Sequence, residues 1–348
     1  MKAALLEGLN AMTVKEVPTP TVAPGAILVK VHACAVCGSD IRIFHFGNER
    51  VKFPQVIGHE IAGEVVEVGK NVTNFKAGDR VAIGADVPCG QCEFCQNGLG
   101  NNCPINFAIG YQFPGGFAEY ILLNPMTVSF GPVSKIPEGL GYDEASLAEP
   151  LACAINGLEL SRLKVGDTIC IIGAGPIGCM MIDLARVMGA TKVIVVQRSA
   201  RRMSLAKKFQ ADFYISSEKE DPVEAVPRLT GGMGPEVVVT ACGEVAAHEQ
   251  AIRMVKKRGY VNLFGGLPKD VRDLSIPSNI IHYKECFVHG SHGSVPRHHR
   301  AALDLIASGK VRVGKVISGT FPLSRTLDAF KAHEERSGLK LIIHPQEK

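Results

Sequence analysis

The second half of the chain contains an apolar run that leads directly into a glycine-rich turn and then into a helical pattern. The run is TICII, residues 168–172, and the turn is GAGPIG, residues 173–178, with the helical pattern starting at Pro176. A strand followed by Gly-x-Gly-x-x-Gly and a helix is typical of a dinucleotide-binding unit. The glycine motif alone would equally suit a plain turn, so the strand before it and the helix after it carry the prediction.

Each position of this motif has a physical role in such a unit. Gly173 allows the tight turn, Gly175 lets the backbone approach a pyrophosphate, and Gly178 permits close helix packing. Pro176 and Ile177 begin the helix whose N-terminus faces the phosphates. The sequence therefore predicts a cofactor-binding loop here.

Apolar β-branched runs alternate with helical segments from about residue 165 onward. A second helix is predicted from about Ala200. The further runs are KVIVV (192–196), EVVVTA (236–241), YVNLF (260–264) and ECFVHG (285–290). This alternation predicts an α/β fold with a parallel sheet covered by helices on both faces.

The first half of the chain has a different pattern, with short β-type runs separated by Gly, Pro and Asp turns. These runs are ILVKVHA (27–33), EIAGEVVEVG (60–69) and DRVAIG (79–84). After about residue 291 the sequence predicts one more helix, Arg297 to Ser308, and short strands. Because 348 residues exceed the size at which a single core keeps growing, we expect two domains.

Composition excludes several classes of protein. A net charge of +4 is too small to indicate nucleic-acid binding, and no apolar stretch approaches the roughly 18 residues of a membrane span. The N-terminus MKAALLEG lacks a signal-peptide pattern, so we expect a cytoplasmic protein without a nucleic-acid or membrane partner. Its eleven cysteines are then not expected to form a disulfide framework.

Four of the cysteines lie in one loop, CGQCEFCQNGLGNNC. Tetrahedral zinc with four thiolate ligands closes such a loop well, and it leaves no open position for a substrate. The alternatives are an iron–sulfur cluster, whose commoner spacings differ, and unliganded thiols, which would oxidise readily. We therefore predict a structural zinc bound by Cys89, Cys92, Cys95 and Cys103.

Other segments supply a second candidate metal site. Cys37 lies in CGSD, His59 and Glu60 lie in GHE, and Glu149 lies in AEP. Cysteine, histidine and carboxylate form the mixed ligand set of a catalytic zinc. Taken singly, Cys37 could be a buried apolar residue, His59 a turn histidine and Glu149 a helix N-terminal charge.

Taken together, these segments resemble one family. CGSD, GHE, AGEVVEVG, GDRV, the four-cysteine loop, GGFAEY, AEPLACAINGL and GAGPIG occur in the order found in the zinc-dependent medium-chain dehydrogenase/reductase superfamily. The likeness is to the polyol branch, with its sorbitol, threonine and hexitol-phosphate dehydrogenases, because Glu149 and Pro150 stand where other alcohol dehydrogenases carry a cysteine ligand.

The resemblance implies an architecture. Residues 1–152 and 291–348 would form a split GroES-like β-rich catalytic domain, and residues 153–290 a Rossmann domain with a doubly wound parallel sheet. It also implies a homodimer or homotetramer. The implied reaction is hydride transfer between a secondary alcohol and a nicotinamide cofactor, with zinc as the Lewis acid.

The resemblance also assigns site residues. Cys37 and His59 would be fixed zinc ligands, and Glu60 and Glu149 the two carboxylates near the metal, of which either could coordinate directly. Asp40 would orient His59, and Ser39 would pass the alcohol proton outward.

The expected proton relay departs from the family pattern at its end. Many relatives have a histidine five residues after the ligand cysteine, where this chain has Arg42. Arginine stays protonated and cannot serve as that base. His45 or water would then end the relay.

Two other classes of protein remain as alternatives. A non-catalytic dinucleotide-binding protein would have lost the metal ligands, and a zinc-free enone or quinone reductase would lack CGSD and the cysteine loop. The substrate stays open among polyols, sugar-alcohol phosphates, amino alcohols and simple secondary alcohols. The basic run RHHR, Arg297 to Arg300, and Arg42 are interpreted as a solvated helix face rather than a phosphate site.

The segment KVIVVQRSARR bears on the choice of dinucleotide. An NAD enzyme usually places Asp or Glu about twenty residues after the glycine motif, where this chain has Gln197. The following residues, Arg198, Ser199 and Arg202, can bind a phosphate, and they resemble the segment of NADP-dependent polyol dehydrogenases. We therefore expect NADP to be preferred over NAD, although a solvated basic helix start would have the same composition.

Overall fold

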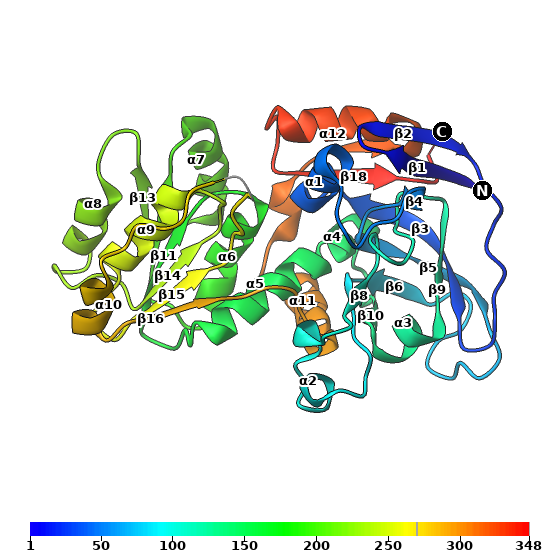
Figure 1. Ribbon diagram of the computed structural model, residues 1–348, viewed down its shortest axis with the longest axis horizontal. Coiled ribbons are helices and arrows are strands. Elements are labelled where there is room, and N and C mark those ends of the chain that lie inside the picture. Colours follow the sequence, from blue (N-terminus) through cyan, green and yellow to red (C-terminus); the bar gives the residue numbers. More distant parts are fainter. Residues whose placement is uncertain (269–270, 348) are drawn as a thin grey trace. The chain divides into compact units, whose positions relative to one another are not determined.

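The computed structural model describes residues 1–268 and 271–347, which divide into two compact units (Figure 1). The first unit comprises Met1–Ala152, Gly293–Gly309 and Val316–Lys348, and the second comprises Cys153–His292 and Lys310–Lys315. Each unit has its own apolar core. Among the described residues, no helix has both the length and the apolar composition that crossing a membrane requires.

The second unit is built on a six-stranded parallel sheet with the order β13-β12-β11-β14-β15-β16. The strands are β11 (Thr168–Ile172), β12 (Lys192–Gln197), β13 (Phe213–Ser216), β14 (Val237–Thr240), β15 (Tyr260–Leu263) and β16 (Phe287–Gly290). The order runs outward in both directions from β11, as in a doubly wound Rossmann sheet. The predicted α/β fold is therefore confirmed.

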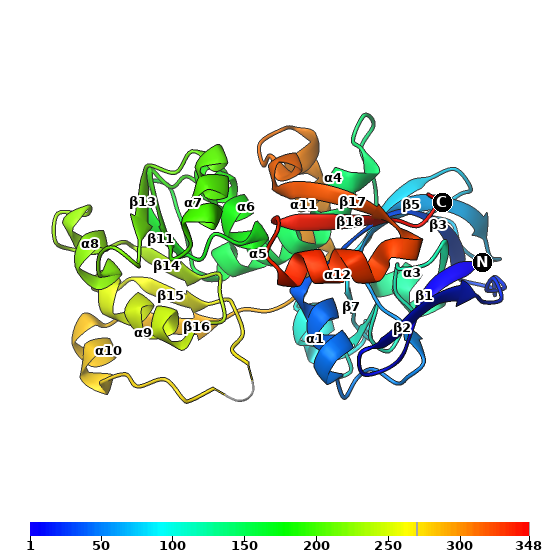
Figure 2. The ribbon, with the colours of Figure 1, turned by 90° about the horizontal axis from the view of Figure 1, so that it is seen from above.

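Helices cover both faces of this sheet, as Figure 2 shows, with α6 and α7 on one face and α9 and α10 on the other. The helices are α6 (Pro176–Val187), α7 (Ala200–Ala206), α8 (Pro222–Arg228), α9 (Val245–Met254) and α10 (Ser278–Lys284). Because β11 lies where the direction of winding changes, the turn from β11 into α6 occupies the switch point at which such folds bind their ligands.

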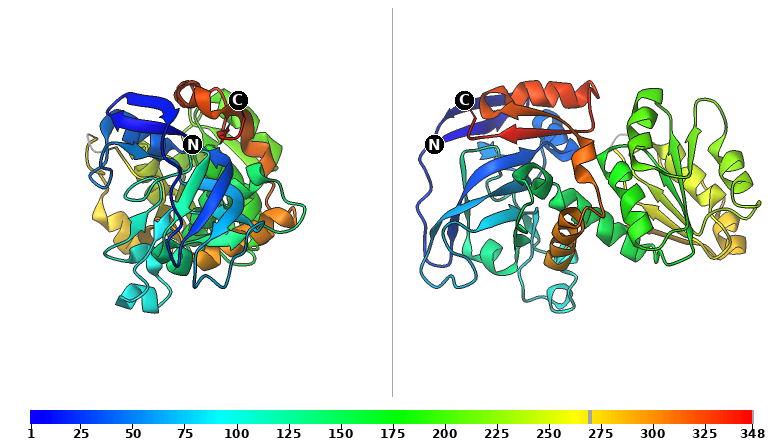
Figure 3. Two further views of the ribbon diagram at one scale, coloured as in Figure 1. Left: turned by 90° about the vertical axis from the view of Figure 1, so that its right-hand side faces the viewer. Right: turned by 180° about the vertical axis from the view of Figure 1, so that it is seen from behind.

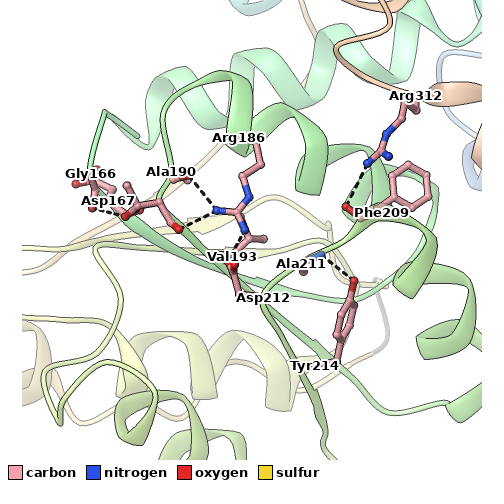
Figure 4. Close-up of polar contacts among 11 residues, drawn as sticks. Gly166, Asp167, Arg186, Ala190, Val193, Phe209, Ala211, Asp212, Tyr214 and Arg312 are labelled. Atoms are coloured by element: carbon pink, nitrogen blue, oxygen red, sulfur yellow. Dashed lines mark hydrogen bonds and ion pairs between the residues drawn. The ribbon is translucent and has the colours of Figure 1, made fainter.

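Polar contacts tie the helices of this unit to the sheet edge (Figure 4). Arg186 at the end of α6 donates to Asp212 and to the carbonyl of Ala190, and the Tyr214 hydroxyl accepts from the N–H of Ala211. The segment Lys310–Lys315 is held in the same unit by Arg312, as described below.

The first unit is β-rich. Its largest sheet has seven strands in the order β10-β6-β5-β3-β18-β17, with β9 pairing alongside β3. These strands are β3 (Ile27–Ala35), β5 (Glu60–Val68), β6 (Arg80–Ile83), β9 (Tyr120–Leu123), β10 (Val133–Lys135), β17 (Ile317–Pro322) and β18 (Lys340–His344). The C-terminal strands thus enter the sheet of the first half, and the expected GroES-like β-rich fold is confirmed.

Smaller elements complete the first unit. Two minor sheets pair β2-β1-β4 and β7-β8. These elements are β1 (Lys2–Gly8), β2 (Ala11–Glu16), β4 (Gln55–Val56), β7 (Asp86–Val87), β8 (Phe107–Ala108), α1 (Gly38–Phe46), α2 (Glu93–Gln96), α3 (Pro125–Phe130), α4 (Tyr142–Ser146), α11 (Pro296–Ala307) and α12 (Thr326–Glu334). The boundary at Ala152 falls within α5 (Ala148–Leu160).

Both chain ends lie in the first unit, as Figure 3 shows. The N–H of Lys2 donates to the Glu119 carboxylate at 2.7 Å, and the Gln346 side chain donates to the Glu119 carbonyl at 2.8 Å. Glu119, which directly precedes β9, therefore holds both the N-terminal and the C-terminal segment of the chain.

Candidate functional site

Strand pairing brings together two of the segments predicted to hold a metal. In the β3·β5 pair, Ala35 lies opposite Glu60. Cys37 follows β3 as the N-cap of α1, and His59 directly precedes β5. The ligand atoms of Cys37, His59 and Glu60 consequently lie within 4.8 Å of one another.

Asp40 holds the first two of these residues in place. One of its carboxylate oxygens accepts the N–H of Cys37 at 2.9 Å, and the other lies 3.3 Å from Nδ1 of His59. Burial lowers the pKa of His59, but the charge of Asp40 and its hydrogen bond, together with Cys37, raise it more, so the pKa lies well above its usual range. With Nδ1 directed at Asp40, Nε2 of His59 is left for a metal.

Glu60 is completely buried, and its two oxygens have different surroundings. Oε1 accepts a hydrogen bond from Nζ of Lys340 at 2.5 Å, whereas Oε2 has no partner among the described residues. Burial lowers the pKa of Lys340, but Glu60, together with Cys37 and Glu149, raises it more. A buried carboxylate oxygen without a partner is costly unless a ligand satisfies it, so this atom fits a metal ion.

Glu149 lies on the first turn of α5 and is buried. Burial, followed by the neighbouring charges of Glu60 and Asp86, raises its pKa to about 7 against the lowering effect of His59. It is near these residues but does not belong to the group whose ligand atoms lie within 4.8 Å. Of the two predicted carboxylates, Glu60 is the one that this structure places with Cys37 and His59.

The predicted relay residues occupy different environments. The Ser39 hydroxyl lies 3.4 Å from Nε2 of His59. Arg42 is exposed on α1. His45 contacts Asn10 through Nδ1 and Glu334 through Nε2, so both of its ring nitrogens have partners.

Tyr111 is a residue near the site that the sequence did not identify. Its ring lies 6.0 Å from the His59 ring, and its half-buried side chain faces Ser39. Burial raises the pKa of the Tyr111 hydroxyl, while His59 and a hydrogen bond to Ser39 lower it less strongly. No motif marks this tyrosine, which follows Gly110 in a loop.

The four-cysteine loop is compact. All four sulfur atoms lie within 4.8 Å of one another, with Sγ of Cys95 3.4 Å from that of Cys92 and 3.9 Å from that of Cys89. Thiolates about 2.3 Å from one tetrahedral zinc would lie about 3.8 Å apart, so the spacing fits a single zinc. All eleven cysteines of the chain are free thiols.

Backbone N–H groups favour the thiolate form of Cys89 and Cys103, whereas burial raises the pKa of Cys95 to about 12. The N–H of Cys89 donates to Sγ of Cys103, and that of Cys92 donates to Sγ of Cys89, both at 3.4 Å. Burial raises the pKa of Cys103, but hydrogen bonds from backbone donors including Asn106 together lower it more, so that the net pKa is about 6. Since metals bind the thiolate, the loop is suited to zinc.

The glycine motif adopts the conformation that its sequence predicts. Gly173 has φ +105°, and a Cβ atom on Gly178 would lie 2.0 Å from the Gly173 carbonyl oxygen. A Cβ on Gly175 would meet only Nη1 of Arg202, at 3.6 Å. Gly178 is thus required by packing, whereas Gly175 leaves open backbone at the N-cap of α6, ahead of Pro176 and Ile177.

Residues after β12 lie close to this loop. Oε1 of Gln197 accepts the N–H of Ala174 at 2.8 Å. Ser199 is the N-cap of α7, where its hydroxyl accepts the N–H of Arg202. Arg198 is exposed and lies 3.9 Å from the carboxylate of Glu244.

The run RHHR was expected to be a solvated helix face, and this is wrong for its two histidines. His298 and His299 are buried on α11, while Arg300 is exposed. His299 contacts the Ser134 hydroxyl through Nδ1, and burial lowers its pKa to about 3. The short run gives no periodicity from which the buried side could be identified.

Two family models match the chain. One is described as the alcohol dehydrogenase GroES-like domain and matches residues 23–133, and the other as zinc-binding dehydrogenase and matches residues 176–308. Among curated relatives, D-arabitol-phosphate dehydrogenase of Enterococcus avium is 33% identical, over 98% of this chain and 96% of the relative. L-threonine 3-dehydrogenase of Bacillus velezensis is also 33% identical, over 98% of each.

Solved structures agree with these matches. A zinc-binding dehydrogenase from Sinorhizobium meliloti 1021, bound to NADP, superposes with a TM-score of 0.92 at 34% identity, over 99% of each chain. An alcohol dehydrogenase from Escherichia coli CFT073, complexed with NADH, gives 0.89 at 28% identity, over 99% of each chain.

Proposed function

Because the chain belongs to the zinc-containing medium-chain alcohol dehydrogenase family, we propose that it interconverts a polyol, sugar alcohol or sugar-alcohol phosphate and the corresponding ketone. The observation that carries this proposal is the grouped donor set of Cys37, His59 and Glu60. An amino alcohol such as threonine is the alternative, since a threonine dehydrogenase is similar to the same extent.

The donor sets fit the two zinc ions that the family implies. Cys37, His59 and Glu60 would hold the catalytic zinc, with Glu149 nearby, and the four-cysteine loop would hold the structural zinc. When bound, the catalytic zinc supplies a Lewis acid at the substrate oxygen, and the nicotinamide accepts or donates the hydride.

The surrounding residues have roles that follow from their contacts. Asp40 fixes the His59 ring through Nδ1, so that Nε2 is left to bind the metal beside Cys37 and Glu60. The Ser39 hydroxyl, beside that nitrogen, is placed to accept the alcohol proton and pass it on. A guanidinium has no acceptor for a proton, so Arg42 cannot end this relay as a base.

NADP is the proposed cofactor, bound by the loop Gly173 to Gly178. Gln197 supports this preference because a neutral side chain would not repel a 2′-phosphate. Arg202 lies beside Gly175, Ser199 is the N-cap of the same helix and Arg198 is exposed next to it in the sequence, so these three side chains would bind that phosphate.

We also propose a domain division and an oligomeric state. Residues 1–152 and 291–348 would act as the catalytic domain and residues 153–290 as the dinucleotide-binding domain. The edge strand β16 supports a homodimer or homotetramer, because Phe287 on it is 48% exposed. Light scattering of the wild type and of Phe287→Asp would measure the oligomer and its dependence on this strand.

The test of the proposed reaction combines metal content with activity. Zinc-loaded protein should contain two zinc ions per chain and oxidise secondary polyols with NADP or NAD. His59→Ala should abolish oxidation while dinucleotide binding persists, whereas His282→Ala, at an exposed histidine, should change neither. Turnover like that of the wild type in a His59→Ala variant lacking the catalytic zinc would contradict the proposal.

A further inference from the structure

A positively charged side chain lies one aromatic ring away from the predicted metal ligands. The guanidinium carbon of Arg50 is 5.1 Å from the centre of the Tyr111 ring, and this ring is 6.0 Å from that of His59. All three residues belong to the first unit. The Tyr111 ring therefore contacts the Arg50 guanidinium and also lies near His59, one of the predicted metal ligands.

Arg50 is held in this position by its local structure. The turn after α1 is closed by Asn48, whose side chain accepts the N–H of Arg50 at 2.9 Å and whose carbonyl accepts that of Val51 at 2.9 Å. Nη2 of Arg50 donates to the carbonyl of Asn106 at 2.5 Å. The half-buried side chain is thus fixed at both ends.

Arg50 has no carboxylate partner among the described residues. Within residues 1–268 and 271–347, no carboxylate oxygen lies within 4.0 Å of its guanidinium, whereas Arg312 and Arg272 each pair with a carboxylate. A guanidinium has five N–H donors, and Asn106 uses one of them. A fixed and partly desolvated arginine with unused donors is suited to bind an anion through two oxygens.

We propose that Arg50 binds an anionic group, a phosphate ester or a carboxylate, on the substrate of this enzyme, with the Tyr111 ring as its support. This inference rests on the proposed function and specifies its substrate class as secondary alcohols that carry such a group. The carbon chain of a pentitol or hexitol is long enough to reach across one aromatic ring. One end of the substrate can thus be held at Arg50 while a hydroxyl lies at the metal ligands Cys37, His59 and Glu60.

The test compares neutral and anionic alcohols. Zinc-loaded enzyme would be assayed with D-arabitol, D-sorbitol, their terminal phosphate esters, and D-gluconate as the carboxylate. An anionic substrate should exceed its neutral counterpart in kcat/KM by about tenfold or more. Phosphate esters and gluconate together distinguish the two sources of negative charge.

Arg50→Gln should remove that advantage mainly by raising KM, while the neutral polyols change by no more than about twofold, and Arg50→Lys should restore part of it. The matched control is Lys52→Gln, an exposed cation of the same segment, which should leave all values unchanged. Equal loss for neutral and anionic substrates in Arg50→Gln would assign Arg50 a purely structural role and overturn the inference, as would a preference for neutral polyols.

A calorimetric titration separates this inference from the proposed function. Sorbitol and sorbitol 6-phosphate would be titrated into zinc-loaded wild type and Arg50→Gln without dinucleotide. Absence of any alcohol oxidation would refute the proposed function, yet tighter binding of the phosphate ester that Arg50→Gln abolishes would still support the inference. Equal binding of the two compounds by the wild type would overturn it.

Discussion

The buried ammonium of Lys340 lies 2.5 Å from Oε1 of Glu60, although the two residues are 280 positions apart in the sequence. Lys340 also donates to the Val36 carbonyl at 3.0 Å. This pair holds Oε1 of Glu60, while Oε2 has no hydrogen-bond partner among the described residues.

Lys340→Met is expected to destabilise the metal-free protein by about 3–5 kcal/mol, because it leaves a buried carboxylate without its partner. The loss should be smaller in zinc-loaded protein, since the metal can then compensate the charge of Glu60. Thermal unfolding with zinc and with a chelator measures both values. An equal loss of stability with zinc and with the chelator would show that Glu60 does not bind the metal.

Gly175→Ala and Gly178→Ala should have different effects. The Cβ of Gly178→Ala would collide with the Gly173 carbonyl, so this variant should lose stability. Gly175→Ala has room in the free protein and should unfold at nearly the wild-type temperature, but the methyl group should weaken dinucleotide binding by about tenfold or more. Calorimetric binding and thermal unfolding of both variants test this contrast, which would be wrong if both variants lost stability equally.

The preference for NADP should depend on Arg198 and, in the opposite direction, on Glu244. Arg198→Ala should lower the ratio of kcat/KM for NADP over NAD by about tenfold or more, since a charge-assisted hydrogen bond is worth roughly 1.5–3 kcal/mol. Glu244→Gln should raise the ratio by up to about fivefold, because it removes a competing exposed ion pair.

Arg228→Ala, at an exposed arginine paired with Glu220, is the control and should leave the ratio unchanged. A wild type that prefers NAD, or a ratio that is indifferent to Arg198, would refute the assignment.

Cys92→Ser should remove one of two zinc ions per chain and lower the unfolding temperature, with little effect on the turnover of the remaining folded enzyme. Cys286→Ser, outside the loop, should retain both ions. Elemental analysis and thermal unfolding give the result. Retention of full metal content and stability together with loss of hydride transfer would place the chemistry in this loop instead.

Stability should also depend on the protonation of His344. Burial lowers its pKa, but Asp143 at 2.8 Å and Glu347 at 2.9 Å raise it more, so the folded value lies above 6.5. The charged form therefore contributes stability that is fully present below about pH 6.5 and is lost as pH rises through the folded pKa.

His344→Gln should accordingly lower the unfolding temperature most at about pH 5.5 and least at about pH 9. A difference between variant and wild type that stays constant across this range would exclude the proposed ionic contribution.

The sequence identified those parts of the fold whose signal is local. The runs TICII and KVIVV correspond to β11 and β12, and the glycine motif connects β11 to α6 as expected. Strand β13 was not predicted, because FYIS is short and its first residue, Phe213, is exposed at the sheet edge. The family resemblance placed residues 291–348 in the same domain as the first half, but no local pattern indicated that β18 would pair with β3.

The same distinction applies to the site. Cys37, His59 and Glu60 lie in recognisable motifs, whereas Arg50, Tyr111 and Lys340 acquire their places only through tertiary contacts. Lys340 begins an apolar strand, and a single charge there does not reveal that its partner lies on β5. Residues that act through long-range pairing therefore escape motif-based analysis.

The salt bridge between Arg312 and Asp183 limits how the dinucleotide-binding unit could be expressed by itself. Nε and Nη2 of Arg312 donate to the two oxygens of the buried Asp183 at 2.9 and 2.6 Å. A fragment ending at His292 would contain Asp183 but not this arginine, leaving a buried negative charge that costs several kcal/mol. A minimal recombinant cofactor domain would thus need either the segment Lys310–Lys315 grafted onto it or an uncharged residue in place of Asp183.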